Sequence, residues 1–157
     1  LETPYEGETE VIHFLELFRD KIGFDEIAKK VVNPIGKKIG AYYGCLLLRP
    51  GKVMEMDNPE NPKILEDFIK AIGGEPVIYA RRNECCGGYI TMEDKNIANK
   101  KSGLILENAK EQGAELLVTA CPLCLYNLKK NTDGHELPVV YFTELLAQAL
   151  GVKKGDE

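Results

Sequence analysis

The chain has 157 residues, of which 44% are hydrophobic and 29% charged, and its formal net charge is -5 at pH 7. These proportions are typical of a folded globular protein, and the length suits a single domain with one substantial core. The negative charge removes the electrostatic basis for binding nucleic acid or an anionic membrane. The longest apolar runs, residues 41–48 and 116–120, are far shorter than the ~20 residues of a membrane helix. We therefore expect no nucleic-acid partner and no membrane span.

The chain starts with an acidic segment, Leu1–Glu6, that has neither an initiator Met nor a basic and apolar secretion signal. This start indicates a piece of a larger protein, and the missing signal indicates a cytoplasmic location. A helix is predicted after the stretch around Thr9, because apolar residues then recur at helical spacing: Val11, Phe14, Leu15 and Phe18. Residues 24–32 predict a second, shorter helix. We expect residues 1–35 to form a helical segment packed on the rest of the domain.

Short apolar runs alternate with helical patterns along the remaining chain. The runs predict strands at residues 39–46, 76–80, 116–120 and 139–142. The helical patterns predict helices at residues 64–72 and 94–112, a short helix from Pro122, and a last helix capped by Thr143. This alternation predicts an α/β fold: a four-stranded, mainly parallel sheet with right-handed crossovers and helices on both faces.

The five cysteines follow three of the predicted strands. Cys45 is placed at the end of the first strand, Cys85 and Cys86 follow the second, and Cys121 and Cys124 follow the third. The carboxyl ends of parallel strands meet at one edge of a sheet, and this edge is where binding sites form in open α/β sheets. We therefore expect one metal-binding site made by all five cysteines.

Other roles for the cysteines are open alternatives. Free cysteines can be small buried hydrophobic residues, but these cysteines lie in turn-rich loops. Structural disulfides do not suit an odd number of cysteines in an α/β chain without a secretion signal. A redox pair made by Cys121 and Cys124 would benefit from the helix that begins there, but it leaves three cysteines unexplained.

Zinc is the strongest alternative, because it needs four ligands and the pair Cys121 and Cys124 has the spacing of a zinc knuckle. The adjacent pair Cys85 and Cys86 favours a cluster instead. Neighbouring side chains diverge in an extended backbone, so they do not easily grip one ion, although the two following glycines allow the chain to curl. A cluster of several irons spreads its ligand positions, so adjacent thiolates can hold different irons and a fifth ligand has a place.

Several motifs together resemble one known family. They are Tyr42-Tyr43-Gly44-Cys45, Arg49-Pro50, Asn61-Pro62, Cys85-Cys86-Gly87-Gly88, Gly113-Ala114 and Thr119-Ala120-Cys121-Pro122-Leu123-Cys124. The pattern resembles the cysteine-rich CCG domain of the B subunit of CoB-CoM heterodisulfide reductase, in particular the C-terminal of the two copies that this family carries. The resemblance covers nearly the whole chain and implies that residues 1–157 are a single CCG domain from a larger two-copy subunit.

The resemblance implies a noncubane [4Fe-4S] cluster bound through Cys45, Cys85, Cys86, Cys121 and Cys124. It also implies an oxidoreductase subunit that reduces a disulfide of two thiol coenzymes, as in methanogenesis. The implied partners are a second CCG domain and an iron-sulfur electron donor similar to the C subunit of heterodisulfide reductase. Because this sequence has one CCG motif, the chain alone would be half of an active site. Related domains occur in oxidoreductases acting on lactate, glycerol 3-phosphate and succinate, and the alternative is a structural zinc-binding or interaction module.

The other candidates are charged or aromatic residues near the cysteines. Four cations fall in the surrounding loops: Arg49, Lys52, Arg81 and Arg82. Solvated loop cations are the simpler interpretation, and attraction of an anionic thiol cofactor is the alternative. The two histidines, His13 and His135, are expected to be structural or exposed. The tyrosines beside the cysteines are expected to pack without a catalytic role: Tyr42, Tyr43 and Tyr89.

Overall fold

The computed structural model describes residues 6–152, so most of the acidic start and the polar tail at 153–157 lie outside the described part. Four strands form one sheet in the order β2-β1-β3-β4, and every neighbouring pair is parallel. Their bounds are β1 (Lys38–Tyr42), β2 (Glu75–Val77), β3 (Leu116–Thr119) and β4 (Val139–Tyr141). The predicted α/β fold with a four-stranded parallel sheet is confirmed.

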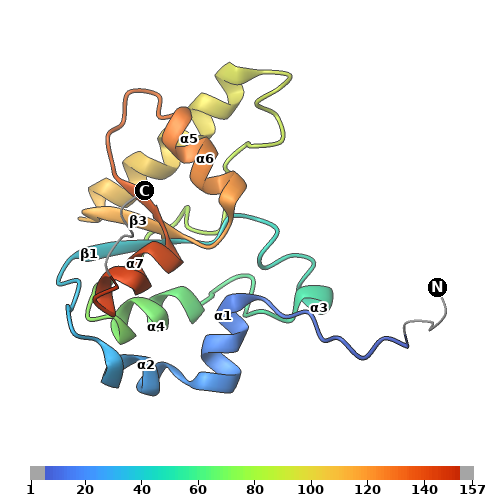
Figure 1. The fold of residues 1–157 in the computed structure, drawn as a ribbon. Helices are drawn as coiled ribbons and strands as arrows, with labels where there is room; N and C mark the ends of the chain where they lie inside the picture. Colours follow the sequence, from blue (N-terminus) through green and yellow to red (C-terminus); the bar gives the residue numbers. More distant parts are fainter. Residues whose placement is uncertain (1–5, 153–157) are drawn as a thin grey trace.

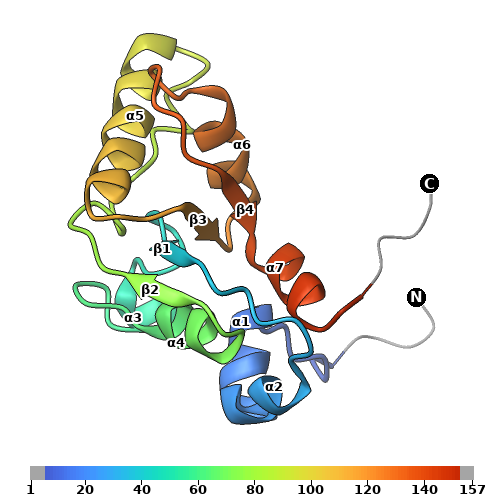
Figure 2. The same cartoon turned by 90° about the vertical axis from the view of Figure 1, so that its left-hand side faces the viewer.

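Helices cover both faces of this sheet (Figure 1). One face carries α5 (Lys95–Glu111) and α6 (Pro122–Lys130). The other face carries α1 (Phe14–Glu16), which continues as a π-helical segment (Leu17–Ile22), together with α2 (Phe24–Lys30), α4 (Ile64–Ala71) and α7 (Phe142–Ala149). Turned by 90°, the sheet is seen between these two layers (Figure 2). A short helix that the sequence did not predict, α3 (Gly51–Met54), lies in the connection after β1.

Each face of the sheet packs on its own apolar core. Ile39, Ala41 and Val118 belong to the core shared with α4 and α7, whereas Leu117 belongs to the core shared with α5 and α6. Successive strand residues point to opposite faces, so both kinds of position are apolar and the strands read as continuous apolar runs. Phenylalanines from different elements contact one another in the first core, where the rings of Phe68 and Phe142 meet edge to face with centroids 5.8 Å apart.

The direction of winding reverses between β1 and β3. From β1 the chain crosses to β2 on one side, whereas β3 and β4 lie on the other side. The last residues of the two central strands, Tyr42 and Thr119, are register partners, so both strands end at the same height. Loops that leave such a reversal point diverge and leave a crevice beyond the carboxyl ends of the strands.

Several predicted boundaries are wrong. β1 ends at Tyr42 instead of residue 46, so Cys45 lies three residues beyond the strand in a turn. The strand stops because Gly44 adopts a left-handed backbone with φ 67°. β2 ends at Val77 instead of residue 80, and α7 begins at Phe142 with no side-chain cap from Thr143.

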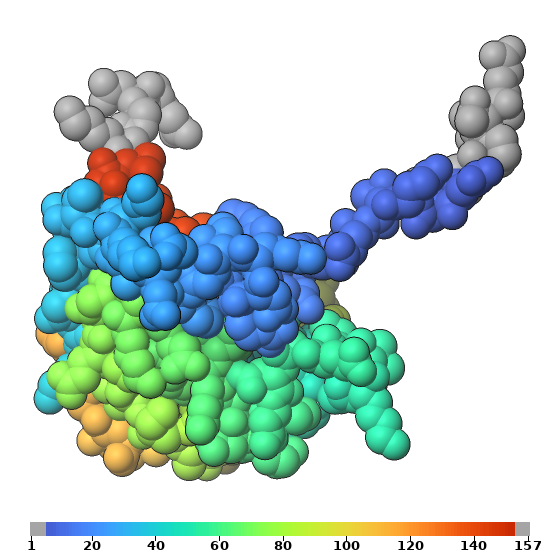
Figure 3. Space-filling model, turned by 90° about the horizontal axis from the view of Figure 1, so that it is seen from below, coloured from blue at the N-terminus to red at the C-terminus, as the bar shows by residue number. Residues whose placement is uncertain are grey.

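The predicted helix start near Thr9 is also wrong. The first helical residue is Phe14, and His13 caps the helix in a box with Glu16, whose carboxylate accepts from the His13 backbone N–H at 2.7 Å. Residues 6–12 run away from the body as an extended arm (Figures 1 and 3), and Val11 is 91% exposed. The apolar side chain of Val11 therefore belongs to the arm and not to the helix.

Candidate metal centre

The structure brings all five cysteines to one small cavity beyond the carboxyl ends of the strands. The cavity has a volume of about 30 Å³, and its walls include Cys45, Cys85, Cys86, Cys121 and Cys124. All five are free thiols, of which Cys86 and Cys124 are buried and the others half-buried. The site is assembled from three separate loops, as expected for the crevice of an open parallel sheet.

The pair Cys121 and Cys124 is positioned by the start of α6. Cys121 is the N-cap, and its sulfur accepts a hydrogen bond from the Cys124 backbone N–H at 3.4 Å. Pro122 occupies the first helical position, where a missing N–H costs nothing. The helix start therefore points backbone donors at Cys121 and places Cys124 one turn further on, on the same side.

The adjacent pair Cys85 and Cys86 is held by hydrogen bonds to alternate carbonyl groups. The Tyr42 hydroxyl donates to the Glu84 carbonyl at 2.7 Å. The Asn127 amide donates to the Cys86 carbonyl at 2.7 Å, and Ser102 donates to the same oxygen at 3.1 Å. These contacts fix the backbone on both sides of Cys85, so the orientation of the pair is set by β1, α5 and α6.

Gly44 allows the first loop to reach the other two. A Cβ added at Gly44 would lie 2.9 Å from the Cys124 sulfur, which is closer than Cβ atoms come to other atoms in real proteins. The positive φ of Gly44 also favours glycine over any other residue. The turn that presents Cys45 therefore depends on the absence of a side chain at this position.

Hydrogen bonds among the sulfurs favour thiolates at neutral pH. The hydrogen bond with Cys124 lowers the pKa of the Cys86 thiol to about 6 and also lowers the pKa of the Cys121 thiol to about 6. Cys124 has one S–H proton and can donate to only one of these sulfurs at a time, and this donor role raises its own pKa. Burial raises the pKa of Cys45. Cys86 and Cys121 are thus favoured as thiolates, the form of cysteine that binds metal.

Comparison with known proteins identifies the family. The sequence profile described as "Cysteine-rich domain" (CCG) matches residues 39–129, more than half of the chain and all five cysteines. The chain belongs to the CCG family. The resemblance inferred from the cysteine motifs is confirmed.

Curated relatives of this CCG domain are subunits of oxidoreductases. The 8-methylmenaquinol:fumarate reductase membrane anchor subunit of Wolinella succinogenes is 30% identical, over 94% of this chain and 55% of its own length. The B subunit of the ferredoxin/F(420)H(2)-dependent CoB-CoM heterodisulfide reductase of Methanosarcina acetivorans is 28% identical, over 94% of this chain and 52% of its own. A protein of Archaeoglobus profundus that is named as similar to the B subunit of heterodisulfide reductase is also 28% identical, over 94% and 54%. The chain spans about half the length of these relatives.

One of these relatives is named a membrane anchor, which raises the question of whether a CCG helix could cross a bilayer. Within residues 6–152, no helix combines the length and the apolar composition needed to cross a membrane.

The sulfur donors of the CCG domain fit a thiophilic metal. The sulfurs of Cys86 and Cys124 lie 3.7 Å apart. Two thiolates on one tetrahedral metal with bonds of ~2.3 Å would be about 3.8 Å apart, so this pair has the spacing of ligands to a common metal atom. Within residues 6–152, no three cysteine, histidine or carboxylate side chains are already arranged to hold one ion. A tetrahedral zinc ion uses four ligands, whereas the cavity offers five sulfurs, so the number of donors favours a cluster over one ion.

Most of the cations near the site have structural partners. Arg81 pairs with Glu84 at 2.7 Å, and Arg82 donates to the Asn61 side chain at 2.7 Å while its guanidinium lies 3.3 Å from a Glu66 oxygen. Arg49 donates to the carbonyl groups of residues 59 and 83 and pairs with the exposed carboxylate of residue 60. These contacts hold the loops together and favour a structural role for the arginines. Arg82 is buried, so the prediction of a solvated loop cation is wrong for Arg82.

The predictions for His13, Tyr42 and Tyr43 are confirmed, whereas the prediction for Tyr89 is wrong. His13 is structural, because its ring caps α1 by accepting from the Leu15 N–H at 3.1 Å. Tyr42 and Tyr43 are fully buried, as expected for packing residues. Tyr89 is 64% exposed on the wall of the cysteine cavity, so the packing prediction is wrong for Tyr89.

Sequence reasoning missed the buried groups that hold the Cys85–Cys86 turn. A signal for two of them was present. Asn127 follows Cys124 by three residues, so the two share one face of α6, and Ser102 is a polar residue in the apolar stripe of α5 between Ala98 and Ile105.

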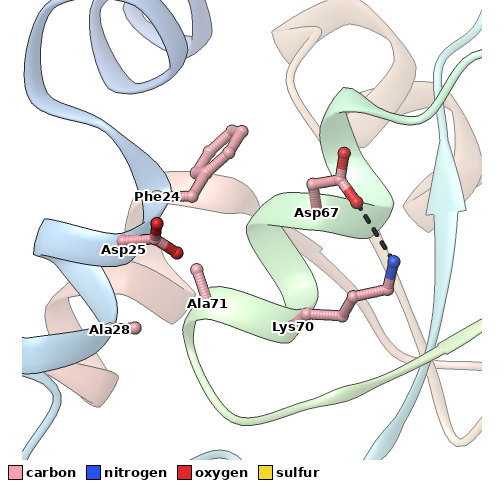
Figure 4. Close-up of a pocket in the computed structure, with 6 residues that line it drawn as sticks. All are labelled: Phe24, Asp25, Ala28, Asp67, Lys70 and Ala71. Carbon is pink, nitrogen blue, oxygen red and sulfur yellow. Dashed lines mark hydrogen bonds and ion pairs between the residues drawn. The ribbon is translucent and has the colours of Figure 1, made fainter.

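A second hollow lies between α2 and α4, about 500 Å³ in volume, and contains none of the cysteines (Figure 4). Its charged residues include Asp67 and Lys70, which pair with each other at 3.1 Å. The hollow lies towards the carboxyl end of α4, which leads into the start of β2. It is therefore near the amino ends of the strands, whereas the cysteine loops lie beyond their carboxyl ends. This hollow is therefore separate from the cysteine cavity.

Proposed function

We propose that this CCG domain binds an iron-sulfur cluster within an oxidoreductase subunit of the heterodisulfide reductase type, which reduces a disulfide of thiol coenzymes. The observation that carries the proposal is the lining of one cavity by five free cysteines from three loops. The proposed ligands are Cys45, Cys85, Cys86, Cys121 and Cys124. The relatives named as the B subunit of CoB-CoM heterodisulfide reductase support the substrate class.

The cluster in this proposal is the noncubane [4Fe-4S] type. An adjacent cysteine pair and a fifth sulfur favour several irons over a single zinc ion. When bound, the cluster would supply electrons and iron sites able to bind sulfur. The residues of the chain hold it: three ligands are half-buried and two buried, and backbone N–H groups of the α6 start donate to Cys121.

The proposal includes a partner that covers the cavity. Leu46, Tyr89 and Leu123 line the cavity yet are 55%, 64% and 39% exposed. A second CCG domain placed over these side chains would bury them and exclude water from the reacting sulfurs. The chain spans about half of its relatives, which is consistent with a second half supplied by a longer chain or by another protein. An iron-sulfur protein similar to the C subunit of heterodisulfide reductase would deliver the electrons.

A second candidate function rests on the relative from Wolinella succinogenes, named as part of a quinol:fumarate reductase. In this alternative the domain holds the same cluster but passes electrons within a complex that acts on a quinol and fumarate. The alternative is distinguished by substrate and not by the cysteine site. A structural zinc module is the remaining possibility for the metal.

Anaerobic reconstitution with iron and sulfide tests the proposal. We expect about four irons per chain with broad visible absorption, and loss of iron when Cys86 is replaced by Ser. Tight binding of one zinc per colourless chain, with no uptake of iron, would contradict the cluster. Activity is then measured with the CoB-CoM disulfide after the second CCG domain and an electron donor are added. A fully reconstituted cluster that transfers electrons from a quinol but does not turn over the disulfide would select the second candidate.

A further inference from the structure

A buried polar group lies directly beneath the Cys85–Cys86 turn. Asn127 is 1% exposed and Ser102 0% exposed, and both lie among the apolar side chains that α5 and α6 place on the sheet. Burying an amide and a hydroxyl costs free energy unless every polar atom finds a partner. The contacts of these two side chains therefore indicate what they are there to hold.

All the hydrogen-bonding capacity of the Asn127 amide is used. Its nitrogen donates to the Cys86 carbonyl at 2.7 Å and to the Ser102 hydroxyl at 3.1 Å. Its oxygen accepts from the Thr91 hydroxyl at 3.0 Å and from the Asn131 amide. A carbonyl can only accept, so the nitrogen of Asn127 must be the atom that faces Cys86. The orientation of the amide is thus fixed by chemistry.

This orientation places an N–H donor beside a proposed ligand. The Asn127 amide directs the positive end of its dipole at the Cys86 peptide, next to the sulfur that is the proposed ligand. A positive dipole end close to a cluster ligand favours the added negative charge of the reduced iron-sulfur cluster, which raises its reduction potential. A buried donor has the strongest effect because no water competes with it.

We propose that Asn127 is a positioning residue for the cluster: it locks the Cys86 carbonyl, and thereby the adjacent cysteine pair, and the positive end of its amide dipole beside Cys86 raises the reduction potential. The inference rests on the proposed function, because it assumes that Cys86 is a ligand. Asn127 contacts the protein and no substrate, so it acts through Cys86.

The test compares Asn127→Leu with a matched variant, Asn108→Leu. Asn108 lies in α5, and its side-chain oxygen accepts from the Arg81 N–H at 3.2 Å, so it anchors the same loop four residues before Cys85 and not at a cysteine. Each reconstituted chain is titrated in the presence of redox mediators and followed by electron paramagnetic resonance. We expect a more negative midpoint potential and an altered spectrum for Asn127→Leu, and wild-type values for Asn108→Leu.

Each outcome decides the proposal. If wild type and Asn127→Leu have equal midpoint potentials at full iron content, Asn127 does not tune the reduction potential. Equal shifts in Asn127→Leu and Asn108→Leu would also overturn this role, because they would reflect loosening of the loop alone. If Asn127→Leu does not fold, the nearly isosteric Asn127→Asp replaces the donor with an acceptor and is expected to shift the potential in the same direction. A wild-type chain that takes up no iron defeats the proposed function instead. The positioning role is then decided on metal-free chains by hydrogen exchange, where unchanged protection of residues 85–91 in Asn127→Leu would overturn it.

Discussion

Replacing Gly44 by alanine is expected to separate folding of the domain from metal binding. The new Cβ would lie 2.9 Å from the Cys124 sulfur, so either Cys124 or the turn after β1 must move. An alanine in the left-handed region costs about 1–2 kcal/mol, and an overpacked contact costs about 1–3 kcal/mol more. The free energy of unfolding should therefore fall by about 2–5 kcal/mol, a loss that a domain of ordinary stability survives.

Gly36 provides the control for this variant. Its φ is 60°, close to the 67° of Gly44, and a Cβ added there meets nothing within 4 Å. In Gly36→Ala the free energy of unfolding should therefore fall only by the backbone cost of about 1–2 kcal/mol, and the chain should keep its full iron content. Urea denaturation of the metal-free chains and iron analysis after reconstitution measure the two effects. A Gly44→Ala chain with wild-type iron content would refute the argument that the sulfurs need this close approach.

Three further results are expected. Removing the metal should increase hydrogen exchange in residues 88–93, where Met92 is 93% exposed, while the sheet keeps its protection; equal exchange with and without metal would contradict this. Phe68→Ala should lower the free energy of unfolding by about 3–5 kcal/mol, because Phe68 is fully buried, yet leave iron binding in the folded chain intact. Burial raises the pKa of Glu66 above its usual 4.5, so the stability given by its neutral form is present below pH 4.5 and lost as the pH rises through the raised value. Glu66→Gln should remove this loss. If the free energy of unfolding of Glu66→Gln ran parallel to that of wild type from pH 4 to 7, the result would count against this reasoning.

The presence of four strands and their parallel direction followed from the alternation of apolar runs and helical patterns, but the ends of the strands did not. The apolar run of the first strand continues through Leu48, which is fully buried although it lies outside the strand. The turn at Gly44 carries the chain across the end of the sheet, so apolar residues after the turn still pack on the core. A run of apolar residues records burial, and burial does not distinguish a strand from a turn that covers the same core.

The N-terminal error has a related cause. Val11 fits the helical spacing of Phe14, Leu15 and Phe18, but the helix begins only where His13 provides a cap. Histidine is not among the residues that usually signal a helix start, so the nearby Thr9 was the expected signal. The capping box depends on Glu16 reaching back to the His13 N–H, which local spacing alone does not establish.

The cysteine site was predictable because its residues follow strand ends, and the fold of an open parallel sheet brings strand ends together. The groups that hold the site were not predictable in the same way. Tyr42, Ser102 and Asn127 come from three different elements and meet only across the turn that carries the cysteine pair. Contacts of this kind depend on the lengths of the connections, which hydrophobic patterns do not specify.

The anchors also bear on how the proposed metal would be bound. Tyr42 belongs to the end of β1, Ser102 to α5 and Asn127 to α6, and the core that these elements share consists mainly of side chains other than cysteine, although it includes Cys86 and Cys124. The carbonyls of Glu84 and Cys86 are therefore held by hydrogen bonds from protein side chains and do not depend on contacts with a metal. A ligand pair that is already oriented loses little conformational entropy on binding, so more of the metal–sulfur interaction is expressed as affinity. In small zinc domains the metal supplies the folding energy itself, whereas here the two apolar cores on the faces of the sheet supply it, so the proposed cluster would not be needed for the domain to fold.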